Sequence, residues 1–102
     1  HGRSRQQRYR RNANWEYIKN LNEININNNI NIPIIGNGDI FNYYDWYNNI
    51  NYTKCSTLMI ARGALIKPWL FTEIKERKSM DISSTERLEI YRKFVKYGLY
   101  YW

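Results

Sequence analysis

Two apolar runs that each end in a glycine-containing turn constrain the fold of this chain more than any other feature. The first, IPIIGNGDIF, covers residues 32–41, and the second, STLMIARGALIKPW, covers residues 56–69. Their apolar stretches, Ile32–Ile35 and Thr57–Ala61, are continuous rather than alternating. Continuous apolarity is typical of parallel strands that are covered on both faces. We therefore predict two short buried strands in a parallel sheet, each followed by a turn.

Helix signals flank both strands. Trp15, Ile18 and Leu21 recur at helical spacing behind a potential asparagine cap, Asn12 or Asn14. We expect four helices, over residues 13–21, 43–47 (capped by Asn42), 67–76 (with Pro68 at its first position) and from the Ser83–Glu86 capping box onward. The order helix, strand, helix, strand, helix, helix predicts an α/β fold with a parallel sheet.

Two further patterns concern the surface of the chain. Residues 22–31 alternate Asn with Ile, and because Asn is common in loops we interpret them as a low-complexity surface connection. Glu89 and Lys93 of the last helix are spaced for an i,i+4 ion pair. The apolar side chains of that helix fall on one face, which we expect to be packed: Leu88, Tyr91, Phe94 and Val95.

The chain is basic and contains a single cysteine. Its 102 residues carry a formal charge of +7, and residues 1–11 hold five arginines without an acidic residue. Such a cluster favours a polyanionic partner, although an ordinary solvated surface also explains it. Because Cys55 is the only cysteine, an internal disulfide is excluded. A single cysteine also favours a reducing compartment, the cytoplasm or alternatively the nucleus. No apolar stretch approaches the roughly 18 residues of a membrane span.

The two turns have the composition of a phosphate site. Gly36 and Gly38 lack Cβ atoms, so the backbone amides of Asn37–Asp39 can approach an anion. Arg62 adds a guanidinium that can contact a phosphate through two hydrogen bonds. Ligands of parallel sheets bind at the carboxyl ends of the strands, where both turns should lie. Each turn alone is also explained by a tight strand-to-helix connection, and Asp39 is also a candidate cap of the next helix.

Three segments of the chain resemble one family. HGRSRQQRY at residues 1–9, IPIIGNGDI at 32–40 and MIARGALIKPWLFTEIKE at 59–76 are similar to the C-terminal part of the tRNA-dihydrouridine synthases, flavoenzymes with a (β/α)8 barrel. The similarity continues through DISSTERLEIYRKFVKYGLYYW at 81–102. It is highest to the eukaryotic subfamily that acts on the variable loop of tRNA.

The resemblance implies reduction of a specific tRNA uridine to dihydrouridine, with FMN as the flavin and NADPH or NADH as the reductant. It implies FMN contacts from residues of the two turns and the start of the chain: His1, Asn37, Gly38, Asp39, Ala61 and Arg62. It also implies tRNA contacts from Arg3, Arg5, Arg8 and Arg10. The catalytic cysteine of the family would precede His1, so we expect no catalytic residue here. Cys55 lies before the second strand and is expected to be a partly buried thiol.

The resemblance further implies that the chain is a C-terminal piece of the enzyme. A whole (β/α)8 barrel needs about 250 residues, so we expect residues 1–80 to contain only strands 6–8, with 22–31 as a loop insert. Residues 81–102 would begin a helical tRNA-binding region. We expect the full-length protein to be a monomer without membrane or metal contacts in this region, and the piece alone to be inactive.

Two other functions fit parts of the sequence. Another FMN-dependent barrel oxidoreductase, acting on a small molecule, would share the two turns but not the HGRSR start. A non-catalytic basic RNA-binding module would explain the charge and the aromatic residues. It would not explain two phosphate-type turns behind two buried strands.

Overall fold

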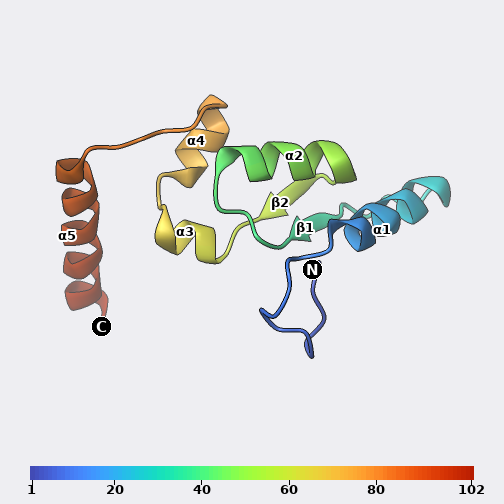
Figure 1. The fold of residues 1–102 in the computed structure, drawn as a ribbon, viewed down its shortest axis with the longest axis horizontal. Coiled ribbons are helices and arrows are strands. Elements are labelled where there is room, and N and C mark those ends of the chain that lie inside the picture. Colours follow the sequence, from blue (N-terminus) through green and yellow to red (C-terminus); the bar gives the residue numbers. More distant parts are fainter.

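The computed structural model describes residues 1–102 and has a mixed α/β fold, as the sequence predicts. Its elements are, in chain order, α1 (Trp15–Asn27), β1 (Ile35–Asn37), α2 (Tyr43–Thr53), β2 (Thr57–Met59), α3 (Arg62–Ile66), α4 (Leu70–Glu76) and α5 (Ser84–Tyr101). Residues 1–14 form an irregular loop that hangs below the sheet in Figure 1. The observed order has one helix more than the sequence predicts.

The two strands form a parallel sheet, which confirms the central prediction. Ile35 is in register with Thr57, and Gly36 with Leu58. Only one face of this sheet is covered, because Gly36 and Leu58 are buried while Ile35 and Met59 are 53% and 56% exposed. The expectation of strands covered on both faces is therefore wrong for this chain, since its own helices leave the second face open. The strand starts and ends also differ from the predicted bounds: β1 begins at Ile35, and β2 ends at Met59.

Helix α1 is longer than predicted. Asn14 caps its start by accepting a hydrogen bond from the Glu16 amide (3.0 Å). The helix then continues to Asn27, so the interpretation of residues 22–31 as a surface connection is wrong for its first half. Asn22 is buried, and its side-chain amide donates to the carbonyl oxygens of Thr53 and Lys54 at 3.0 Å each. These tertiary hydrogen bonds to the end of α2 offset the poor helix propensity of asparagine.

Helix α2 begins as expected but ends later. The Asn42 side chain accepts a hydrogen bond from the Asp45 amide (2.8 Å), which confirms the predicted cap. The helix runs six residues beyond the predicted end, to Thr53, and Lys54 terminates it in the left-handed conformation (φ 57°). Trp46 and Ile50, both in α2, pack against the hydrophobic core. This packing stabilises turns of helix for which the local sequence carries no strong signal.

The single helix predicted over residues 67–76 is wrong, because two helices flank Pro68. Helix α3 starts at Arg62 and ends at Ile66, and α4 starts at Leu70. Lys67 is extended (φ −137°, ψ 79°), as expected for a residue that precedes proline. Pro68 therefore separates α3 from α4 instead of opening a helix.

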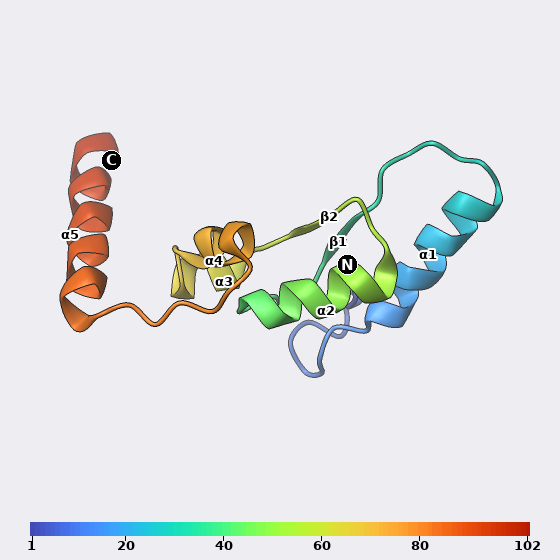
Figure 2. The ribbon, with the colours of Figure 1, turned by 90° about the horizontal axis from the view of Figure 1, so that it is seen from above.

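Helix α5 stands apart from the other elements (Figures 1 and 2). Its start is confirmed: the Glu86 amide donates to the Ser83 hydroxyl (3.2 Å) in the predicted capping box. Glu89 pairs with Arg92 at 2.6 Å, so the expected pair with Lys93 is wrong. The apolar face expected to be packed is exposed, and none of the 18 residues of α5 is buried.

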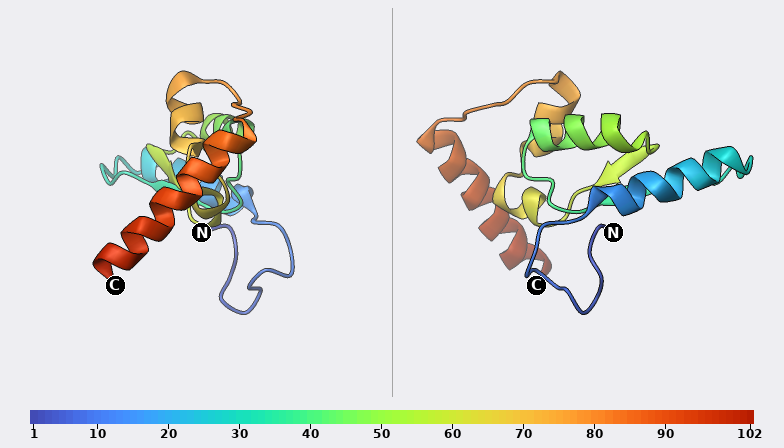
Figure 3. Two further views of the ribbon diagram at one scale, coloured as in Figure 1. Left: turned by 90° about the vertical axis from the view of Figure 1, so that its left-hand side faces the viewer. Right: turned by 45° about the vertical axis from the view of Figure 1, so that its right-hand side comes forward.

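The core of the chain is small and lies between α1, α2, α4 and the sheet (Figure 3). Its buried apolar residues are Ile18, Ile40, Cys55, Leu58 and Leu70. The radius of gyration is 16.4 Å, compared with about 13 Å for a compact chain of this length. The chain is therefore extended, with much apolar surface that its own elements do not cover.

Candidate functional site at the ends of the strands

A hollow of about 70 Å³ opens beyond the carboxyl ends of β1 and β2. It is lined by His1, Tyr9, Asn37, Gly38, Asp39, Ile40, Phe41, Met59, Ala61, Arg62 and Gly63, and we call it the strand-end hollow. All six residues that the resemblance assigns to FMN line it. Its volume is far below the roughly 300–1,000 Å³ of a whole cofactor pocket, so it has the size of a site for one end of a cofactor.

Residues of the two turns make up most of the lining of this hollow. Gly38 has a φ of +145°, a conformation that residues with a Cβ rarely adopt. A Cβ on Gly63 would overlap the carbonyl oxygen of Ile40. The Asn37 side chain donates to the Met59 carbonyl oxygen (2.9 Å) and so joins the first turn to the second strand. Gly36 does not line the hollow, because a Cβ there would point at Trp15 and Leu58. The approach of the Asn37–Asp39 amides to an anion stays a prediction.

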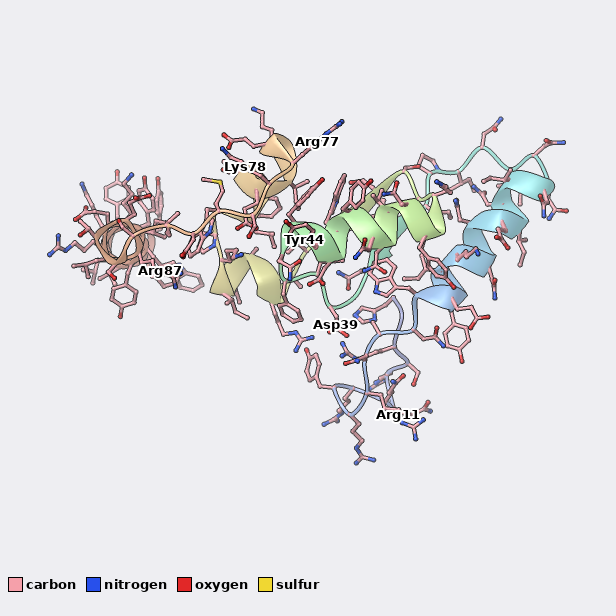
Figure 4. All side chains as sticks on the ribbon, turned by 45° about the horizontal axis from the view of Figure 1, so that its top comes forward. Arg11, Asp39, Tyr44, Arg77, Lys78 and Arg87 are labelled. Atoms are coloured by element: carbon pink, nitrogen blue, oxygen red, sulfur yellow. The ribbon has the colours of Figure 1, made fainter.

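Asp39 connects three segments through its carboxylate. Oδ1 accepts a hydrogen bond from Arg62 Nη2 (2.9 Å), and Oδ2 accepts from Arg3 Nη2 and from the Ala13 amide (2.7 Å each). Figure 4 shows Asp39 between the sheet and the N-terminal loop. The alternative that Asp39 caps the next helix is wrong, because Asn42 provides that cap.

Asp39 is ionised at neutral pH. Burial alone would raise its pKa, but the hydrogen bonds from Ala13 and Arg3 and the charges of Arg3 and Arg62 lower the pKa below its usual value. Two guanidiniums around one carboxylate leave a net positive charge beside the hollow. That charge favours an anionic ligand.

Arg62 is held at the edge of the hollow by aromatic rings as well as by Asp39. Its guanidinium carbon lies 4.3 Å from the centre of the Tyr9 ring and 5.3 Å from that of Phe41. Its side chain is 43% exposed, so the guanidinium is accessible to a ligand. The phosphate signal in the sequence identified Arg62 but missed Tyr9 and Phe41, because no motif predicts a contact between segments so distant in the chain.

Residues 1–11 are here called the arginine loop. Their arginines fall into two groups. The Arg3 side chain is 8% exposed. Besides pairing with Asp39, it donates through Nε to the Arg11 carbonyl oxygen. Arg5, Arg8, Arg10 and Arg11 are exposed. Only this second group presents its charge to solvent.

Cys55 lies away from this site. It is buried in the core, directly before β2 starts, whereas the hollow lies beyond the end of that strand. No group of three or more histidine, cysteine or carboxylate side chains is arranged to hold a metal ion. None of the helices combines the length and the apolar character needed to cross a bilayer.

A family model and several known proteins are similar to this chain over all or nearly all of its length. A family model described as "Dihydrouridine synthase (Dus)" matches residues 1–98. The chain is 53% identical over 102 residues to a Xenopus tropicalis protein, and 52% identical over 105 residues to an Arabidopsis thaliana protein, both named tRNA-dihydrouridine(47) synthase NAD(P)(+)-like. It is 51% identical over 107 residues to the tRNA-dihydrouridine(47) synthase NAD(P)(+) of Cryptococcus neoformans. Each match covers 100% of this chain but only 14–15% of the relative, so the chain spans about 15% of the length of these proteins.

Proposed function

Because this chain belongs to the dihydrouridine synthase family, we propose that it forms part of an enzyme that reduces a uridine of tRNA to dihydrouridine with NAD(P)H and FMN. The names of the similar proteins support the substrate and the reductant. The family also argues against the two alternative functions, a flavoenzyme for small molecules and a non-catalytic RNA-binding module.

The strand-end hollow is the observation that supports FMN binding by this chain. Residues of both turns line it, its volume suits a phosphate end, and the arginines around Asp39 supply positive charge. These features fit the phosphate of FMN, with Arg62 as the charged contact and Gly38 and Ala61 as backbone contacts. When bound, FMN supplies the hydride transfer from reductant to uracil. The residues of this chain would bind and orient the phosphate end.

We further propose that β1 and β2 are strands 7 and 8 of a (β/α)8 barrel. The Gly2 amide donates to the Asn37 carbonyl oxygen (3.1 Å), which suits residues before Gly2 continuing as strand 6 along the free edge of β1. The uncovered sheet face, with Ile35 and Met59, suits an interior that other strands complete. In this arrangement residues 1–80 belong to the barrel, and residues 81–102 begin a helical region that contributes to tRNA binding.

Replacing Arg62 with alanine in the full-length enzyme should weaken FMN binding by about 1.5–3 kcal/mol, the contribution of a hydrogen bond to a charged group. Flavin fluorescence after dialysis measures the FMN that is retained. Arg92→Ala is a matched control, because Arg92 lies on α5 and pairs only with Glu89 at the surface. Unchanged FMN occupancy in Arg62→Ala would contradict the proposed phosphate site.

A combined replacement of Arg5, Arg8 and Arg10 by glutamine should lower tRNA affinity and flatten its salt dependence. The log–log slope should change by roughly one unit for each phosphate contact that is lost. Binding measured at several salt concentrations gives this slope. Oxidation of NADPH without tRNA should stay unchanged, because these side chains point to solvent rather than line the strand-end hollow.

Lys75→Gln provides the control for charge alone, since Lys75 is exposed on α4. Helix α4 lies on the other side of the sheet from the arginine loop (Figure 1). This variant should retain the salt dependence of the original protein. If the triple variant also retained it, the arginine loop would not contact tRNA.

A further inference from the structure

The strand-end hollow contains an aromatic contact that its phosphate chemistry does not require. The ring of Tyr9 lies over the Arg62 guanidinium at 4.3 Å and near that of Arg3 at 5.7 Å. Both arginines pair with Asp39. Tyr9, Arg62, Asp39 and Arg3 therefore form a closed ring of contacts between the arginine loop and the two turns.

Packing in the hydrophobic core does not explain the position of Tyr9. The residue is 71% exposed and is not part of the hydrophobic core. Arg8 and Arg10, which flank Tyr9 in the sequence, are also exposed. Arg8 adopts a left-handed backbone conformation (φ 49°). That conformation is uncommon for a residue other than glycine. The loop thus turns back toward the hollow at Arg8, and Tyr9 meets Arg62 there.

The contact with Tyr9 reduces the side-chain conformational entropy that Arg62 loses when it binds an anion. A free arginine side chain samples many rotamers, and part of this freedom is lost when its guanidinium is fixed on a ligand. The Tyr9 ring and Asp39 restrain Arg62 before any ligand is present. Restraint of a binding group in its bound position strengthens binding, because the ordering cost has already been met.

We propose that Tyr9 is a positioning residue, which holds the Arg62 guanidinium at the strand-end hollow and so makes binding of the FMN phosphate depend on the arginine loop. This inference rests on the proposed function, since it requires FMN in the hollow. Tyr9 acts through Arg62 and needs no contact of its own with the flavin. The loop that we propose for tRNA and the site that we propose for FMN then share one side chain.

The proposal predicts a specific loss in Tyr9→Ala. The full-length protein is freed of FMN and titrated with FMN and with riboflavin, which lacks the phosphate. Tyr9→Ala should bind FMN about 2–5-fold more weakly, the effect of an exposed cation–π contact of about 0.5–1 kcal/mol. Riboflavin affinity should not change, because riboflavin offers Arg62 no phosphate. Tyr9→Phe keeps the ring and should keep the FMN affinity.

Two further variants separate positioning from general damage to the fold. Tyr17→Ala removes a tyrosine of α1 that is 67% exposed and lies outside the hollow. The Tyr17→Ala protein should therefore bind both flavins normally. In Arg62→Ala, the additional change Tyr9→Ala should have no further effect on FMN affinity, because Tyr9 acts only through Arg62.

The outcomes distinguish the role proposed for Tyr9 from the proposed FMN phosphate site. If Arg62→Ala weakens FMN but Tyr9→Ala does not, the phosphate site stands and the role of Tyr9 is wrong. Equal weakening of FMN and riboflavin in Tyr9→Ala, or an additive loss in the double variant, would also overturn that role. If Arg62→Ala leaves the preference for FMN over riboflavin unchanged, the phosphate site itself is wrong, and the inference about Tyr9 is wrong with it.

Discussion

Replacing Glu73 with alanine should destabilise the full-length protein by about 3–5 kcal/mol, the cost of removing one partner of a buried ion pair. Glu73 is completely buried in α4. Its Oε1 accepts hydrogen bonds from Lys67 Nζ and from the Met80 amide, both at 2.9 Å. The Glu73 carboxylate thus binds the segments before and after α4, and its loss would leave a partly buried lysine and a backbone amide without an acceptor.

Glu76→Ala is the matched control for this prediction. Glu76 lies on the same helix, but its side chain is 48% exposed and pairs with Lys78 at 3.4 Å. Removal of such a surface pair should cost less than about 1 kcal/mol. Denaturant titration of both variants measures the two costs. Similar values for Glu73→Ala and Glu76→Ala would show that the buried pair does not hold α4 in place.

The contribution of Glu73 should also depend on pH. Burial raises its pKa, but the hydrogen bonds from Lys67 and Met80 and the charge of Lys67 lower the pKa below its usual value. A folded pKa below the unfolded value, about 4.3 for glutamate, stabilises the protein above that unfolded value. The stabilisation is lost as the pH falls through the folded pKa. The difference in stability between the original protein and Glu73→Gln should therefore be constant near neutral pH and shrink at acidic pH.

Replacing Gly63 with alanine should destabilise the protein by on the order of 3 kcal/mol, the upper part of the range for overpacked sites. A Cβ at this position would overlap the Ile40 carbonyl oxygen and approach Leu70 Cδ2 to 3.2 Å. The first obstacle is backbone, which cannot rotate away as a side chain does. Because Gly63 and Ile40 both line the strand-end hollow, the shift should also reduce FMN retention. Denaturant titration and flavin content measure the two effects.

Gly98→Ala tests whether this loss comes from the local contact. Gly98 lies within α5, and a Cβ there would meet no other atom within 4 Å. The substitution should stabilise the helix by about 0.5–1 kcal/mol, because alanine has the higher helix propensity. A Gly63→Ala protein as stable as the original would mean that the turn after β2 can move away from Ile40 at little cost.

The helix caps and the two turns could be predicted from the sequence because their causes are local. Asn14, Asn42 and Ser83 each accept a hydrogen bond from an amide two or three residues further along the chain. The glycine turn after β1 depends on a φ that glycine adopts readily. The parallel pairing of the strands follows from their apolar runs and the helix between them. The break at Pro68 also has a local cause, because a residue before proline is disfavoured in a helix.

The tertiary structure decided the features that depend on partners far along the chain. Asn22 belongs to a helix because its amide reaches Thr53 and Lys54. The left-handed turn at Asp39 brings its carboxylate to Arg3 and Arg62, which lie 36 and 23 residues away. No local pattern encodes such contacts, since their energy depends on where the intervening elements pack. The sequence by itself therefore determined which turns form the candidate site, and the packing of the elements decided how Arg62 is held there and by which side chains.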